Sequence, residues 1–122
     1  MLTKSELARW TTALRSGEYI QGRSYLKHHD GITYKHCCLG VLCEVEGLSQ
    51  KTHFGKFVEF DNRMVGHLSG SMSDKLGCQY GRFKLLEMPD LCGYSSLWAA
   101  NDCGVPFSEI ADHLDKYYPA TE

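Results

Sequence analysis

Cysteine and histidine are the residue types of this chain that could support metal chemistry, and each occurs six times in 122 residues. Structural zinc sites favour closely spaced ligand pairs, typified by Cys-x-x-Cys, and the sequence has no Cys-x-x-Cys. A site would have to combine ligands drawn from His36, Cys37, Cys38, Cys43, Cys78, Cys92 and Cys103. Adjacent residues in regular structure point in different directions. We therefore predict no metal site and no cofactor.

Nucleophilic catalysis has little more support. The sequence lacks a Gly-x-Ser-x-Gly turn, a His-Glu-x-x-His helix and a glycine-rich phosphate loop. A pair formed by Cys37 with His28 or His29 stays open, because catalytic partners meet in space and not in sequence. We predict no catalytic residue, and a small Cys- or metal-dependent enzyme is kept as an alternative.

Arginine and tyrosine form the set that points most directly to a ligand. Guanidinium groups match phosphate oxygens, and aromatic rings stack on bases. One helical turn after Trp98, the pair Asn101-Asp102 could hold a purine-like ring. The predicted ligand-binding residues are Arg15, Tyr19, Gln21, Arg23, Tyr25, Arg82, Trp98, Asn101 and Asp102. Their ligand would be a small phosphorylated nucleotide.

The same residues also have a structural interpretation. Asn101-Asp102 can bond its own backbone in a turn or cap a helix. The arginines and tyrosines can form a solvated face on which the tyrosine rings cover the core.

The elements that must position these residues centre on the stretch Tyr34–Glu46. Its first residues alternate like a strand and its last follow helical spacing, so we predict a strand that runs into a buried helix. Gly40 costs about 1 kcal/mol relative to alanine inside a helix, which favours another backbone segment packed against it. The six cysteines of the chain, three of them in this stretch, are predicted to be reduced core residues, because free cysteine is usually buried.

Helices are also predicted at both ends of the chain. Thr3-Lys4-Ser5-Glu6 is a capping box for the first helix. The inward stripe of that helix is Leu7, Trp10 and Leu14. A short helix over residues 97–100 and a final amphipathic helix over residues 107–118 follow near the other end.

Strands are predicted between these helices. Asp30-Gly31 is a strong two-residue hairpin signal, which would pair Lys27 with Tyr34 across the ladder. Residues 53–60 are expected to form one strand, with a returning partner over residues 63–68. A loop over residues 69–73 and a further strand over residues 79–86 complete the middle of the chain.

Together these elements predict one α+β domain over residues 1–122, with a small antiparallel sheet of hairpins, an N-terminal helix, a buried central helix and a C-terminal helix. The formal net charge of -2 gives no pull toward duplex nucleic acid or an anionic membrane. No apolar run has the length of a membrane span, and no export signal is recognised. We expect a cytoplasmic protein. Self-association stays open, because nothing in the pattern fixes a number of subunits.

Three motifs spread along the chain carry a resemblance to a known family. They are Trp10 with Ala13-Leu14-Arg15-Ser16-Gly17 and Gln21-Gly22, then Cys37-Cys38-Leu39-Gly40-Val41-Leu42-Cys43, then Asn101-Asp102 with Glu109-Ile110-Ala111-Asp112. The combination resembles a family of small uncharacterised proteins of bacteriophages and prophages. The resemblance implies a phage accessory protein in the bacterial cytoplasm, and it brings no activity with it.

The final helix departs from this family at its first turn. Relatives tend to open this helix with Ser-Phe-x-Glu, whereas here Pro106 precedes Phe107. Either Pro106 takes the first helical position, where its missing N–H costs nothing, or Ser108 caps a later start.

The function expected from these observations is non-catalytic binding. The protein would help a phage inside its host by sequestering a small nucleotide-type signal of antiviral defence, or by docking on a host protein. Besides the enzyme named above, a purely structural or protein-interaction module is the alternative. Such a module would display an exposed apolar patch and no enclosed polar pocket.

Overall fold

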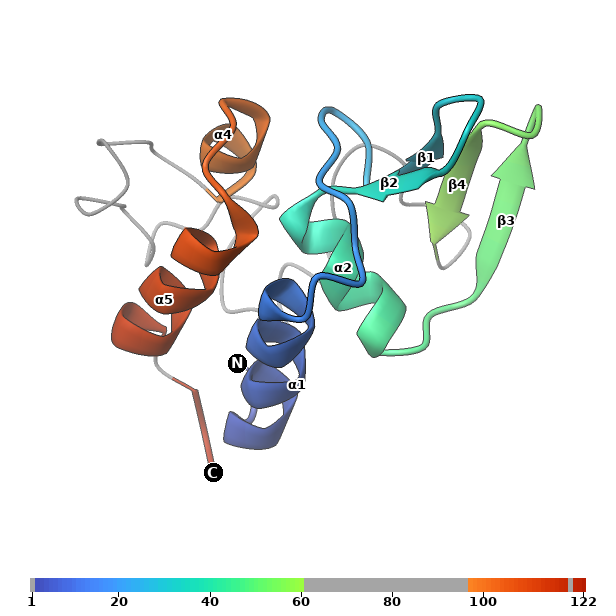
Figure 1. Cartoon of the computed structure of the whole chain (residues 1–122). Coiled ribbons are helices and arrows are strands. Elements are labelled where there is room, and N and C mark those ends of the chain that lie inside the picture. The colour runs from blue at the N-terminus through green and yellow to red at the C-terminus, as the bar shows by residue number, and fades with distance from the viewer. Residues whose placement is uncertain (1, 61–96, 119) are drawn as a thin grey trace.

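The computed structural model describes residues 2–60, 97–118 and 120–122. In chain order its elements are α1 (Lys4–Arg15), β1 (Lys27–His29), β2 (Tyr34–His36), α2 (Cys38–Val45), β3 (Gln50–His53), β4 (Phe57–Phe60), α4 (Leu97–Asp102) and α5 (Phe107–Tyr117). The strands form one antiparallel sheet in the order β2-β1-β4-β3. Figure 1 shows α1 beside α5, with α2 between α1 and the sheet. The predicted α+β fold is confirmed.

The first helix begins where the sequence predicts. The Thr3 hydroxyl accepts a hydrogen bond from the Glu6 N–H at 3.2 Å, and the Glu6 carboxylate accepts one from the Thr3 N–H at 3.1 Å. This is the predicted capping box, and the predicted inward stripe is buried. Trp10 also donates Nε1–H to the carbonyl of Cys38 at 2.9 Å, which joins α1 to the first turn of α2.

Gly40 is the point at which α2 meets the chain that enters β1. A Cβ added to Gly40 would lie 1.7 Å from the carbonyl oxygen of Leu26. The same oxygen accepts a hydrogen bond from the Cys37 N–H at 3.1 Å. The expected close approach of another backbone segment is therefore confirmed. The backbone that approaches Gly40 is that of Leu26, the residue before β1.

The β1–β2 hairpin forms, but its predicted register is wrong by two residues. The observed pairs are Lys27 with His36, His28 with Lys35 and His29 with Tyr34. The Asp30 carboxylate accepts hydrogen bonds from the N–H groups of Ile32 and Thr33, at 2.8 and 2.9 Å. Asp30 thereby starts a longer turn instead of occupying the centre of a two-residue one. A shift of two residues keeps each side chain on the same face of the sheet.

Residues 53–60 contain a turn, so the prediction of one continuous strand is wrong. Phe54 and Gly55 have φ angles of 55° and 63°, and the Lys56 N–H donates to the His53 carbonyl at 3.0 Å. Positive φ at both central residues is the signature of a type I′ turn. A bulky residue rarely adopts positive φ. For this reason the residue types around Phe54 did not predict a turn.

The last helix begins at Phe107, with Pro106 as its extended N-cap residue and no side-chain cap. Neither predicted start, at Pro106 itself or after a cap at Ser108, is observed. The strands and loop predicted over residues 63–68, 69–73 and 79–86 lie outside the described residues. Of the helices that the structure describes, none has the length and apolarity that crossing a membrane requires.

Candidate functional site

Three predicted ligand-binding residues, Gln21, Asn101 and Asp102, converge on one another. Asn101 is fully buried, and its Oδ1 accepts hydrogen bonds from Gln21 Nε2 at 3.0 Å and from the Cys38 N–H at 3.1 Å. Its Nδ2 donates to the Gly22 carbonyl at 2.8 Å. Both polar atoms of Asn101 are thus occupied by protein partners. This network connects the segment after α1 to α4 and α2. It therefore supports the structural interpretation of the Asn101-Asp102 pair.

Arg23 and Ser24 lie at the exposed edge of this network. Ser24 has a φ of 68°, and its N–H donates to Asp102 Oδ1 at 3.0 Å. The hydrogen bond offsets part of the strain of that backbone conformation. Arg23 reaches toward Gly104, where a Cβ would lie 3.5 Å from its Nη2. Arg23 keeps an exposed guanidinium at this edge.

Arg15 is engaged by α5. Its Nη2 lies 2.7 Å from Asp112 Oδ1 and 2.7 Å from Asp115 Oδ2, and hydrogen bonds to these carboxylates raise the pKa of the guanidinium. Two negative charges face one positive charge, so this position offers no net positive field to a phosphate. Arg82 lies outside the described residues, and of Trp98 only its place in α4 is described.

The two predicted tyrosines do not form one stacking platform. The ring of Tyr19 meets His36 edge to face, with centroids 4.9 Å apart. The ring of Tyr25 packs on Phe57 of β4, with centroids 4.6 Å apart. The structure therefore divides the predicted set between the Asn101 network, the α1–α5 contact and two separate ring contacts.

The cysteines of the central stretch are free and buried, as predicted. Cys103 is free but exposed, so the prediction of a core residue is wrong there, and Cys78 and Cys92 lie outside the described residues. Burial raises the pKa of Cys37 to about 11 and that of Cys38 well above its ordinary value. Both stay protonated at neutral pH, whereas the thiolate is the nucleophile and the metal ligand. Within the described ranges, no three His, Cys, Asp or Glu side chains gather as metal ligands would.

Glu44 is the centre of a polar cluster between α2 and the sheet. Its Oε1 lies 3.7 Å from His36 Nε2 and accepts a hydrogen bond from Lys27 Nζ at 3.0 Å. Gln50 accepts from Lys27 at 2.8 Å and donates to the second oxygen of Glu44. The nearby His36 imidazole, and next the Lys27 ammonium, lower the pKa of Glu44 to about 2 against the opposing effect of burial.

Glu44 is therefore expected to make folding stability depend on acid pH. Because its folded pKa lies below the unfolded value near 4.5, the contribution is complete above that value and is lost as the pH falls toward 2. We expect the free energy of unfolding to fall by about 2–3 kcal/mol more in the wild type than in Glu44→Gln. Urea titrations at pH 6, 4, 3 and 2 measure this difference, and parallel profiles for the two proteins would contradict it.

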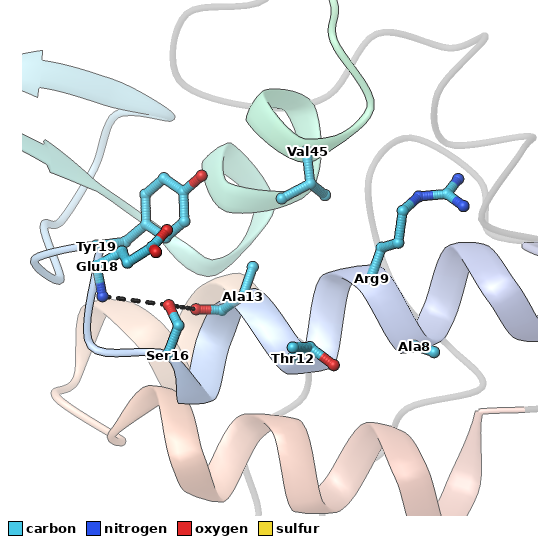
Figure 2. Close-up of a pocket in the computed structure, with 8 residues that line it drawn as sticks. All are labelled: Ala8, Arg9, Thr12, Ala13, Ser16, Glu18, Tyr19 and Val45. Carbon is cyan, nitrogen blue, oxygen red and sulfur yellow. Dashed lines mark hydrogen bonds between the residues drawn. The ribbon is translucent and has the colours of Figure 1, made fainter.

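A groove of about 560 Å³ lies between α1 and the end of α2 (Figure 2). Its lining is mostly apolar. Residues of α1 form one side, Glu18 and Tyr19 follow from the next segment, and Val45 comes from α2. The α1 residues are Ala8, Arg9, Thr12 and Ala13, followed by the C-cap residue Ser16. We call this the α1–α2 groove.

A charged side chain lies at each end of the α1–α2 groove. Figure 2 shows Glu18 and Tyr19 at one end and Arg9 at the other, with Val45 above the middle. Arg9 Nη2 lies 3.3 Å from Glu46 Oε1, so the charge of the arginine is already matched within the chain. An occupant with a cationic group on an apolar body would match the Glu18 end of the groove.

Sequence reasoning missed this groove, since only Tyr19 belongs to the predicted set. A signal was present on α1. Ala8, Thr12 and Ser16 repeat every fourth residue and are exposed, although exposed helix faces usually carry long charged side chains. Small side chains on an outer face leave room for another molecule to approach.

Comparison with known proteins relates nearly the whole chain to one family. The family model described as Domain of unknown function (DUF8296) matches residues 3–118. The matched range includes both α1 and α5. No curated protein and no solved structure matches the chain.

Proposed function

We propose that this chain, which belongs to the family described as Domain of unknown function (DUF8296), is a phage accessory protein that docks on a protein of its bacterial host. It would act in the host cytoplasm and counter antiviral defence by occupying a surface of that protein. The phage part of the proposal is supported by the motifs of the central cysteine stretch and of the Asn101-Asp102 segment.

One observation carries the binding part of the proposal, namely the open and mostly apolar α1–α2 groove. Its volume of about 560 Å³ lies within the range of about 300–1,000 Å³ that is usual for binding sites. Small molecules favour enclosed sites with convergent polar groups, whereas this groove is open along its length and carries its charges only at the ends. An amphipathic helix laid along α1 is the type of occupant that fits such a groove.

Docking is preferred to nucleotide sequestration because of where the arginines lie. Arg15 faces two carboxylates of α5, and Gln21 and Asn101 are hydrogen bonded to each other. Of the predicted phosphate-binding groups, Arg23 is the one that the described structure leaves exposed and beside the Asn101 network. A nucleotide held by this edge is the second candidate function.

Thr12→Arg is expected to weaken docking. Thr12 is exposed and lines the groove, so an arginine there fills the groove without disturbing the core. We expect the Kd for the host protein to rise at least about tenfold, which corresponds to about 1.4 kcal/mol. The partner would be identified by crosslinking in the host bacterium, purified, and titrated calorimetrically with both forms of the chain.

Thr52→Arg is the matched control, because Thr52 is also exposed but lies on the edge strand β3. Equal affinities for the two variants would refute docking in the groove. Native mass spectrometry of the same preparations tests the second candidate. A mass excess of a few hundred daltons that Arg23→Ala removes would establish a nucleotide-type ligand in place of a host protein.

A further inference from the structure

Two hairpin turns of the sheet carry large apolar side chains that are almost completely exposed. Phe54, in the β3–β4 turn, is 97% exposed, and Ile32, in the β1–β2 turn, is 89% exposed. Turns of this kind normally carry Gly, Asn, Asp or Ser. Single exposed apolar residues are common, but two on neighbouring turns form a surface that requires an explanation.

The two turns lie at the same end of the sheet. β1 is antiparallel to β4, and the His29 N–H at the end of β1 donates to the Lys56 carbonyl at the start of β4, at 2.7 Å. The end of one hairpin is thereby held against the end of the other, and Figure 1 shows both turns together, away from α1. We call Ile32, Phe54 and the residues of these two turns the hairpin tip.

Phe54 holds its exposed position at an energetic cost. Its φ of 55° is a conformation that disfavours bulky residues and that asparagine adopts more readily. With Gly55 behind it, asparagine at this position would give the Asn-Gly pair that type I′ hairpins prefer. The structure thus keeps a strained phenylalanine that buries nothing within its own chain. Residues of this kind concentrate at sites of function.

The α1–α2 groove has the size, and at Glu18 the charge, to receive the hairpin tip of a second copy. The groove is mostly apolar and measures about 560 Å³. It has Glu18 at one end and Arg9 at the other. The tip carries a cation, Lys56, in the turn of Phe54, whereas Asp30 in the turn of Ile32 is already paired with Lys35 at 3.2 Å. Lys56 can thus face Glu18, which is the charge pair that the contact would form.

We propose that copies of this chain associate head to tail, with Phe54 and Ile32 of one copy inserted into the α1–α2 groove of the next. The two surfaces of this contact differ, so each copy keeps a free tip or a free groove for a further copy. A host segment would compete with the second copy for the same groove. The self-contact itself stands without the proposed host docking.

Phe54→Asn is expected to strengthen the fold and weaken the association. Removing the strain should raise Tm by about 3–5 °C. Losing the inserted ring should raise the dissociation constant of the self-contact by about 10- to 100-fold. Thermal melts and analytical ultracentrifugation of the full chain over a concentration series measure the two effects. Because the variant is the more stable protein, its loss of association would not come from unfolding.

Mixing two variants tests the head-to-tail geometry. Phe54→Asn keeps its groove and Thr12→Arg keeps its tip, so each alone should be monomeric and an equimolar mixture should form dimers and nothing larger. Lys56→Glu and Glu18→Lys should each weaken association a few-fold, and the double variant should restore it.

Three outcomes would overturn the proposal. They are a wild-type chain that stays monomeric at millimolar concentration, variants that fail to complement each other, and a monomer that binds vesicles of phosphatidylcholine and phosphatidylserine through Phe54. Phe54→Asn distinguishes this proposal from the proposed function. Host docking and self-association both use the groove, so both should fail in Thr12→Arg. Only self-association uses the hairpin tip, so host docking should survive in Phe54→Asn.

Discussion

Gly40→Ala is expected to destabilise the protein more than any other single methyl addition in the described chain. The added Cβ would lie 1.7 Å from the Leu26 carbonyl oxygen and 2.6 Å from its carbon, so either α2 or the chain entering β1 must move. The same oxygen accepts the Cys37 N–H, and that hydrogen bond would be lost with the movement. Against a gain of about 1 kcal/mol in helix propensity, we expect a net loss of about 3 kcal/mol or more.

Urea unfolding followed by circular dichroism measures this loss, provided that the variant folds. Gly17→Ala is a suitable control, because a Cβ there meets nothing within 4 Å and only its φ of +77° opposes alanine. That control should cost about 1–2 kcal/mol. Equal losses for the two variants would show that the contact with Leu26 does not constrain Gly40. A folded Gly40→Ala with unchanged m value and stability would refute the close approach outright.

The sequence predicted the elements whose cause is local. The capping box of α1, the strand leading into α2 and the burial of the cysteines of the central stretch all follow from residue types within a few positions of each other. Gly40 was informative for a related reason, since a glycine inside a buried helix is costly unless another segment needs the space. The identity of that segment, at Leu26, required the tertiary structure.

The parts that were mispredicted depend on single side chains acting against propensity. The β1–β2 register shifted because the Asp30 carboxylate bonds two N–H groups of the turn. The β3–β4 turn was missed because Phe54 adopts a conformation that its residue type disfavours. Local rules fail most often where a structure carries strain for another purpose, which is consistent with a binding role for the hairpin tip.

The predicted site residues show how distant partners change the role of a side chain. Arg15 is matched to phosphate by its chemistry, but Asp112 and Asp115 meet it from the far end of the chain. Spacing along the sequence contains no information about such a meeting. The α1–α2 groove was missed for the converse reason, because its small residues have no chemistry of their own and act by leaving space.

Asn101→Ala is expected to cost about 3–5 kcal/mol, the second large effect. The change removes the side-chain partner of the Cys38 N–H and of the Gly22 carbonyl. It also removes one of the two hydrogen bonds that Gln21 donates. Each buried polar group left unsatisfied costs about 1–3 kcal/mol. The free energy of unfolding in urea measures the loss, and a loss below about 1 kcal/mol would contradict the structural role of Asn101.

Asn101→Asp separates the loss of hydrogen bonds from the loss of volume. A carboxylate can still accept from Gln21 and the Cys38 N–H, but it cannot donate to the Gly22 carbonyl, and it would lie buried beside the Asp102 carboxylate. Burial and the neighbouring charge raise the pKa of such a group. Its folded pKa would then exceed the unfolded value near 3.9, so the deficit relative to wild type should be small at pH 4 and should grow as the pH rises toward 7. A deficit that is independent of pH would mean that the new carboxyl group reaches solvent, and the Asn101 network would then open far more easily than its hydrogen bonds imply.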